Sequence, residues 1–204
     1  GSPVARSVAS SVPSSADDPV ATALRDAATA ALAQVSAASS SPTAPVVLID
    51  GRSGSGKTTL AALIAADWPS PVRVVALDDI YPGWDGLAQG AETAREEILA
   101  PHRAGRPARW RRWDWSAERQ GESDAVGPGT GLIVEGSGVL TPASAVLADV
   151  RIWLESPAGS RRERALRRDG DTYRPHWERW AAQEDIHLAR DHPRHWATLV
   201  AEIP

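Results

Sequence analysis

The sequence predicts an α/β domain in three layers, with a parallel sheet of about five strands and helices on both faces. Short apolar runs recur from residue 45 onward, and they are apolar at every position, as in strands buried on both faces. Helix-forming segments separate these runs, which is typical of parallel strands. The length of 204 residues fits one domain, and 42% apolar with 24% charged residues is ordinary globular usage.

The order of the elements follows from this pattern. The expected strands are 45–50, 72–79, 131–136, 148–155 and 197–203. A helix over 58–66 follows the first strand directly. Residues 1–44 are rich in Ala, Ser and Pro, which predicts a flexible tail with mobile stretches at 1–16 and 36–45. Between them we expect one helix over 17–35, whose thin apolar face leans on the edge of the main domain. The main domain is therefore expected over 45–204.

Composition excludes several classes of protein. The chain has no cysteine, so it has neither disulfides nor cysteine-ligated zinc, and it is compatible with the reducing cytoplasm. A net charge of −4 disfavours a nucleic-acid partner, since such proteins are normally basic. No run of about 18 apolar residues is present, so we expect no membrane span.

A phosphate-binding motif joins the first strand to its helix. Residues 51–58 read GRSGSGKT, a complete G-x-x-x-x-G-K-[ST] pattern, the P-loop. Its backbone amides wrap a β-phosphate, its lysine bridges the β- and γ-phosphates, and its threonine ligates Mg²⁺. Lys57 is the one lysine among 22 basic residues, at a point where a guanidinium would not fit. The residues expected to hold ATP are Gly51, Ser53, Gly54, Ser55, Gly56, Lys57, Thr58 and Thr59.

The class of P-loop protein follows from the acids near the motif. Guanine recognition by N-K-x-D needs a second lysine, which the chain lacks. ATPase motors carry an acidic pair after a neighbouring strand, whereas GLIVEG offers Glu135 alone. Kinases instead place an acid at the end of the second strand, where Asp78 and Asp79 stand. This pattern favours a kinase with ATP and Mg²⁺ as its cofactors.

Two adjacent acids cannot both face one site while the chain is extended, because successive side chains point to opposite faces. We therefore expect at most one of Asp78 and Asp79 to face the site. An acid there could accept the proton of an acceptor hydroxyl or help to hold Mg²⁺, which favours an alcohol over a phosphate acceptor. The alternative role is an N-cap for the following segment.

Three short segments resemble the uridine kinase and phosphoribulokinase family. LDDIYPGWDGL is similar to the family's segment in which D-S-F-Y closes the second strand, and this implies Asp78 as the catalytic acid and Tyr81 as the family's tyrosine. GLIVEG is similar to its hydrophobic-Glu-Gly strand, which implies that Glu135 and Thr58 hold Mg²⁺. The resemblance runs from the first strand to the C-terminus and implies the P-loop kinase fold.

The third segment lies in a long insertion over 80–126. RWDWSAER, at 112–119, resembles the family's Y-D-F followed by a basic residue, where the aspartate grips the acceptor sugar; the family's histidine is missing and tryptophans replace its smaller aromatics. The acceptor residues expected on this basis are Asp79, Tyr81, Trp84, Trp113, Asp114 and Arg119. The Trp- and Arg-rich stretch 109–115 could instead bind single-stranded nucleic acid or form the insertion's own small core.

An arginine-rich lid is expected over 156–175. Arg161, Arg164 and Arg168 are spaced i, i+3 and i+7, so they share one helix face. In P-loop kinases such arginines neutralise the transferring phosphoryl group. Similarity to the uridine kinase lid favours Arg164 and Arg168 as catalytic phosphate contacts. The alternative is a solvated basic face paired with neighbouring acids.

The last expected helix, 176–190, has an apolar stripe that suits packing against the sheet. Glu184 falls on this stripe, so its carboxylate should either reach the site or find a buried partner. His187 and His192 are expected to be packing or surface residues rather than metal ligands.

Taken together, these features predict a small-molecule kinase that transfers the γ-phosphoryl group of Mg·ATP to a hydroxyl of a nucleoside-like acceptor. Two alternatives remain open from the sequence. One is a kinase for a nucleoside monophosphate or another small alcohol. The other is an ATP-dependent regulatory P-loop protein that acts on a protein partner.

Overall fold

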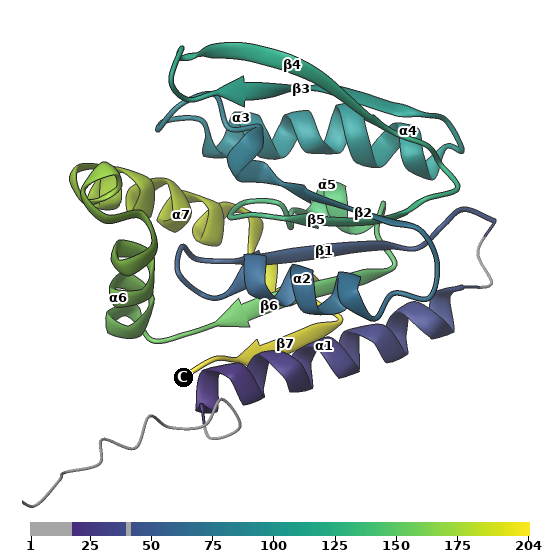
Figure 1. The fold of residues 1–204 in the computed structure, drawn as a ribbon, viewed down its shortest axis with the longest axis horizontal. Helices are drawn as coiled ribbons and strands as arrows, with labels where there is room; N and C mark the ends of the chain where they lie inside the picture. The colour runs from purple at the N-terminus through teal and green to yellow at the C-terminus, as the bar shows by residue number, and fades with distance from the viewer. Residues whose placement is uncertain (1–17, 40–41) are drawn as a thin grey trace, which may run out of the picture.

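A five-stranded parallel sheet runs through the centre of the computed structural model, which describes residues 18–39 and 42–204 (Figure 1). The strands are β1 Val46–Gly51, β2 Val72–Ala76, β5 Gly131–Glu135, β6 Val150–Glu155 and β7 Leu199–Glu202. Their order is β2-β5-β1-β6-β7, with parallel pairing throughout. The predicted fold class is confirmed, and the phosphate motif leaves the central strand.

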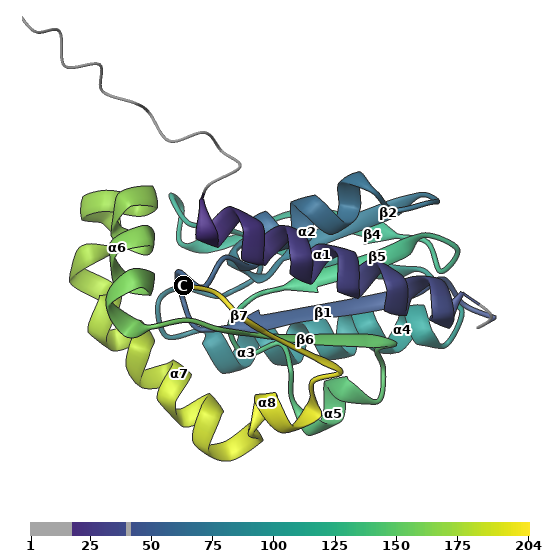
Figure 2. The ribbon, with the colours of Figure 1, turned by 90° about the horizontal axis from the view of Figure 1, so that it is seen from below.

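Helices cover both faces of the sheet. They are α1 Pro19–Ala38, α2 Lys57–Ala66, α3 Leu87–Thr93, α4 Ala100–Arg103, α5 Pro142–Ala145, α6 Ala158–Asp169, α7 Trp177–Asp191 and α8 Pro193–Trp196. Alternate residues of β1 divide between two cores: Val47 and Ile49 pack with α1 and α2, whereas Val46 and Leu48 pack on the opposite side. Figure 2 shows α1 and α2 lying together against the sheet.

The helix that the sequence assigns to an N-terminal tail is part of the folded domain. Helix α1 packs on α2 and β7, and it buries Leu24, Ala31 and Val35. Because these side chains complete one of the two cores, the expected boundary at residue 45 does not separate a tail from a domain. The stretch expected to be mobile at 1–16 lies outside the described residues. Within the linker expected at 36–45, the chain continues α1 to Ala38, and 40–41 also lie outside.

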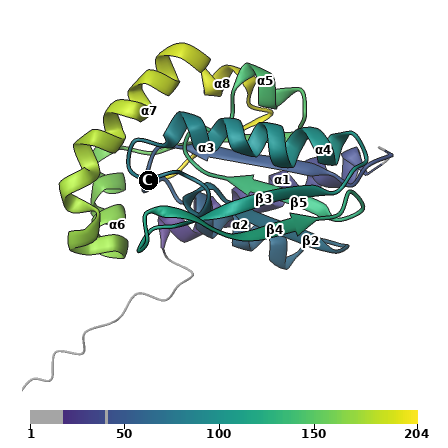
Figure 3. The same ribbon diagram turned by 90° about the horizontal axis from the view of Figure 1, so that it is seen from above.

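The insertion between β2 and β5 folds as a helix followed by a hairpin. A π-helical turn, Ala94–Leu99, joins α3 to α4, and β3 (Ala108–Asp114) pairs antiparallel with β4 (Arg119–Val126). The hairpin lies beside the helix over the β2 edge of the sheet (Figure 3). Trp110 is buried between them, so one part of the Trp- and Arg-rich stretch is indeed the insertion's own core.

All five strands end at the same edge of the sheet, where α6 and α7 stand (Figure 1). The phosphate loop, the end of β2 and the end of β5 therefore converge there, as expected for a binding site in a parallel α/β sheet. None of the helices in the described ranges combines the length and apolar character needed to cross a bilayer.

Candidate active site

The phosphate loop is held in a wrapped conformation between β1 and α2. Gly54 and Gly56 have φ values of +79° and +103°, in the left-handed region that favours glycine. Helix α2 begins at Lys57, one residue before the expected start. The Lys57 ammonium donates to the carbonyl oxygens of Gly51 at 2.8 Å and Arg52 at 3.2 Å. The lysine is thus folded over the loop that it is expected to serve.

Thr58 and Glu135 meet at the centre of the site. The Thr58 hydroxyl donates to Glu135 Oε1 at 2.9 Å. Burial raises the pKa of Glu135, and the nearby Lys57 charge opposes this shift. Hydroxyl and carboxylate oxygens are ligands that suit Mg²⁺. No group of three or more His, Cys, Asp or Glu side chains that could hold a metal occurs in the described ranges.

Of the two adjacent acids, only Asp78 lies over the phosphate loop, since the Asp79 carboxylate pairs with Arg112 at 3.2 Å, yet both residues border the cleft. The reason is local: β2 ends at Ala76, and residues Leu77–Asp79 form a 3-10 turn instead of extended chain. The carboxyl of Asp78 is accessible from the cleft but surrounded by protein, and this desolvation raises its pKa against the charges of Lys57 and Arg168. A raised pKa suits a group that accepts a proton.

Two adjoining spaces open above these residues. One, of about 170 Å³, lies over the phosphate loop, and the other, of about 670 Å³, extends away from it. The residues that line both are Ser53, Thr58, Asp78, Tyr81, Glu135, Arg168 and Trp180. Because these residues are shared, a group bound on the loop and a group bound in the larger cleft would meet at Asp78 and Arg168.

Aromatic rings form the wall of the larger cleft. Trp84 stacks on His176, with ring centroids 4.3 Å apart, and on Tyr173 at 5.5 Å. Trp115 lies 5.0 Å from Trp84, and Trp180 meets Trp84 edge-on. The expectation for Trp84 fits this placement. Sequence reasoning did not assign Trp115 to the site, although its place at the end of a strand, beside a turn, was a usable signal.

Tyr81 lines the cleft but is already engaged. Its ring is buried and packs edge-on against Trp180. Its hydroxyl donates to the carbonyl oxygen of Ser137 at 2.7 Å, and burial raises its pKa well above the usual range. Tyr81 therefore supports the floor of the cleft with its hydroxyl turned to the protein.

Three expected acceptor contacts lie elsewhere. Trp113 lines a small depression between the hairpin and the helix beside it rather than the cleft. The Asp114 carboxylate accepts from the amide and hydroxyl of Ser116, which closes the hairpin turn, and Arg119 is exposed opposite Asp114 in the strand register. The strand ends at Asp114, so the turn carries Trp115 to the cleft. The assignments of Trp113, Asp114 and Arg119 are corrected accordingly.

The lid arginines divide into two kinds. Arg161 donates to the carbonyl oxygen of Ser53 at 3.2 Å, and Arg164 donates to that of Gly54 at 2.8 Å. Both therefore tie α6 to the back of the phosphate loop, which corrects the expectation that Arg164 faces the phosphate. Arg168 lines both spaces of the cleft, where it pairs with Asp169 at 2.7 Å, as the alternative of a basic face paired with neighbouring acids predicts.

Helix α7 also reaches the phosphate loop. The Glu184 carboxylate, expected either to reach the site or to find a buried partner, accepts a hydrogen bond from the Ser53 amide at 2.6 Å. His187 is buried between Asp50 and Asp191. Asp50 escaped the sequence reasoning, and the available signal was a carboxylate at the end of an otherwise apolar strand.

Comparison with known proteins shows the fold. No protein-family model matches the chain, and no curated protein matches it by sequence. A solved structure described as a possible uridine kinase from Bacillus stearothermophilus matches with a TM-score of 0.61 and 20% identity, over 87% of this chain and 98% of the other. A candidate fructose transport system kinase from Silicibacter sp. matches with a TM-score of 0.55 and 21% identity, over the same shares. The fold that the resemblance implied is therefore confirmed: the chain has the fold of these two solved structures.

Proposed function

We propose that the protein is an ATP-dependent kinase that transfers the γ-phosphoryl group of Mg·ATP to a hydroxyl of a small, nucleoside-like molecule. One observation carries this proposal: Asp78 and Arg168 line both the space over the phosphate loop and the aromatic cleft. A proton acceptor and a cation at such a junction are what phosphoryl transfer to an alcohol requires.

The residues divide the chemistry as follows. Lys57 and the loop amides hold the phosphates, while Thr58 and Glu135 hold Mg²⁺ directly or through water. The acceptor oxygen bonds to the γ-phosphorus, the bond from that phosphorus to the bridging oxygen of ADP breaks, and the hydroxyl proton passes to Asp78. Arg168 neutralises the charge of the phosphoryl group during transfer. The raised pKa of Asp78 supports its role as the base.

The lining of the cleft supports an unphosphorylated acceptor with a flat ring. The wall at Trp84 and Trp115 suits stacking of a planar group. Among the described residues that line the larger space, Arg168 is the single cation, whereas the acids are Asp78, Asp79, Glu135 and Asp169. An acidic lining disfavours a second phosphate.

The arginines of the insertion do not change this conclusion. Arg111 donates to the carbonyl oxygen of Gly121, and Arg112 pairs with Asp79 at 3.2 Å. Neither side chain lines the cleft. The nucleoside monophosphate alternative therefore lacks the cationic site that it needs.

ADP release from Mg·ATP tests the proposal. Nucleosides, their monophosphates, sugars and other small alcohols are added one at a time, with Lys57→Ala as the blank. The proposal expects acceleration by an unphosphorylated acceptor and a weaker response to its monophosphate. Slow ADP release that no acceptor changes would favour the regulatory alternative, and preference for a monophosphate would remove Asp78 as the base.

A further inference from the structure

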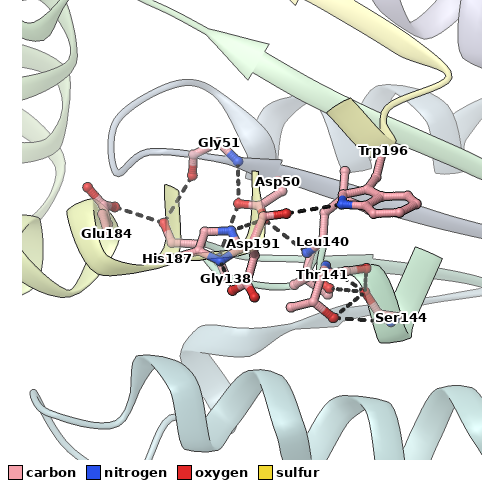
Figure 4. Close-up of polar contacts among 12 residues, drawn as sticks. Asp50, Gly51, Gly138, Leu140, Thr141, Ser144, Glu184, His187, Asp191 and Trp196 are labelled. Carbon is pink, nitrogen blue, oxygen red and sulfur yellow. Dashed lines mark hydrogen bonds and ion pairs between the residues drawn. The ribbon is translucent and has the colours of Figure 1, made fainter. Parts of the chain in front are cut away.

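Three ionisable side chains form a buried stripe along α7. Glu184, His187 and Asp191 are spaced i, i+3 and i+7, so they share one face of the helix. All three are buried; Glu184 and His187 lie toward the start of the phosphate loop, and Asp191 lies behind His187 (Figure 4). Buried charges are costly unless they are paired, so each partner on the facing elements is informative.

His187 joins two carboxylates from different elements. Its Nε2 lies 2.9 Å from Asp50 Oδ2, and its Nδ1 lies 2.8 Å from Asp191 Oδ2. An ionised carboxylate can only accept, so this geometry suits an imidazolium ring, in which both nitrogens donate. Asp50 in turn accepts from the amide of Gly51 at 2.7 Å and that of Leu140 at 2.9 Å. His187 thus secures the residue from which the loop departs.

Glu184 holds the loop at the next residues, Arg52 and Ser53. Its carboxylate accepts from the Ser53 amide at 2.6 Å and from Arg52 Nε at 3.2 Å. The Ser137 hydroxyl lies 2.9 Å from the same carboxylate and 3.0 Å from the carbonyl oxygen of Gly51. Figure 4 shows Glu184 and His187 on the same side of the chain as it passes from Asp50 to Gly51. Helix α7 therefore holds the loop on both sides of Arg52.

We propose that Glu184 and His187 are positioning residues that hold the phosphate loop in its nucleotide-binding conformation before the nucleotide arrives. They contact the start of the loop, Asp50 to Ser53. The glycine-rich remainder of the loop stays free of contacts with these two residues and can bind the phosphates. A loop held in one conformation loses less entropy on binding, which raises affinity. The inference rests on the nucleotide half of the proposed function and does not depend on the acceptor.

The charges around His187 make its contact with Asp50, and so the positioning of the loop, sensitive to pH. Asp50 faces the ring from β1, and Asp191, itself paired with Arg190, faces it from α7. The segment after β5 contributes amides to Asp50, and α8 contributes the Trp196 indole, which donates to the main-chain carbonyl of Asp191. Burial lowers the pKa of His187, but the two carboxylates outweigh it and the pKa is raised. Above that pKa a neutral ring keeps only one donor.

The dissociation constant of ADP, measured by calorimetry, tests the proposal without any turnover. The variants are Glu184→Gln and His187→Gln, with Glu178→Gln and His195→Gln as matched controls at exposed positions. We expect ADP to bind roughly tenfold more weakly to the first two, because each loses a charge-assisted hydrogen bond. The controls should stay within roughly twofold. In a turnover assay, the KM for ATP should rise while the acceptor KM stays unchanged.

Circular dichroism melts separate positioning from folding, and binding is measured well below each melting temperature. If folded Glu184→Gln and His187→Gln bind ADP like wild type, the residues are merely structural and the inference fails. Should His187→Gln not fold, Glu184→Gln decides alone, since it keeps the shape of the side chain. Wild-type protein that binds neither ADP nor ATP would contradict the proposed function itself, whereas wild-type binding that the variants leave unchanged contradicts only this inference.

Discussion

The indole N–H of Trp115 donates a hydrogen bond to the main-chain carbonyl oxygen of Asp78 at 2.7 Å. This contact joins the tip of the β3–β4 hairpin to the turn that carries the proposed base. The same ring lies against Trp84 in the wall of the cleft. The hairpin therefore has two roles, since it encloses the acceptor and supports the backbone at Asp78.

Two substitutions at Trp115 separate these roles. Trp115→Ala removes the ring, so we expect the acceptor KM to rise roughly tenfold or more, as stacking is worth about 1–3 kcal/mol. Trp115→Phe keeps an aromatic ring but loses the N–H, so kcat should fall with little change in the acceptor KM. Steady-state kinetics measures both constants. Trp113→Phe, outside the cleft, is the control, and equal effects there would contradict the corrected assignment.

Replacement of Asp78 tests the base. We expect Asp78→Asn to lower kcat by about 10²- to 10⁴-fold while nucleotide affinity changes little. Asp79→Asn loses an exposed ion pair with Arg112, so its loss should be no more than roughly tenfold. Because desolvation raises the pKa of Asp78, kcat/KM should fall as the pH drops through that raised value. Full turnover by Asp78→Asn would remove the assignment.

Arg168 is expected to matter more than its neighbours on α6. Arg168→Ala removes the cation that lines both spaces, so kcat should fall about 10²- to 10³-fold. Arg162 is exposed on the same helix and is a matched control. Rates measured at saturating substrates compare the two variants. Similar losses in both would mean that the lid acts through its overall charge.

The His187 cluster predicts how stability changes with pH. The folded-state pKa is raised, so the contribution of His187 is complete below its unfolded value of about 6.5 and is lost as the pH rises through the folded value. The difference in unfolding free energy between wild type and His187→Gln should therefore be largest at the acidic end of the range from about pH 5 to about pH 8. Urea titrations across this range measure it, and a difference that grows with pH would contradict the charged ring.

A side chain at Gly54 should destabilise the contact between the phosphate loop and helix α6. A Cβ at Gly54 would lie 2.1 Å from the carbonyl oxygen of Arg161, and φ is +79°. Gly54→Ala should therefore lower the free energy of unfolding by about 2 to 4 kcal/mol. Gly159→Ala on α6 meets nothing within 4 Å and should leave stability unchanged or raise it by up to about 1 kcal/mol. Thermal melts compare the two.

The fold and the phosphate loop could be predicted from the sequence because both depend on local pattern. Apolar runs give the strands directly, and the spacing of glycines and Lys57 gives the loop conformation. Helix α1 was assigned to a tail because its small buried residues, such as Ala27 and Ala31, form a weak apolar pattern. Close packing of alanines depends on the facing helix, which local pattern does not reveal.

The residues that line the larger cleft could not be predicted as well, because they depend on where strand β3 ends. Trp113 and Trp115 are two residues apart and would share a face in a longer strand, but β3 ends at Asp114. In the same way, the turn at Leu77–Asp79 brings two adjacent acids to the cleft. Ser53, whose amide donates to Glu184, lies far from it in the sequence. The role of Glu184 therefore depends on a tertiary contact that local pattern does not reveal.

The measurement that tests the central claim most directly follows the γ-phosphoryl group itself. Mg·ATP labelled in that group is incubated with the acceptor that most accelerates ADP release, and the products are separated. The proposed kinase predicts label on a hydroxyl of the acceptor in a one-to-one ratio with ADP, and none with Lys57→Ala. Label that appears only as inorganic phosphate, at a rate that the acceptor does not change, would contradict phosphoryl transfer.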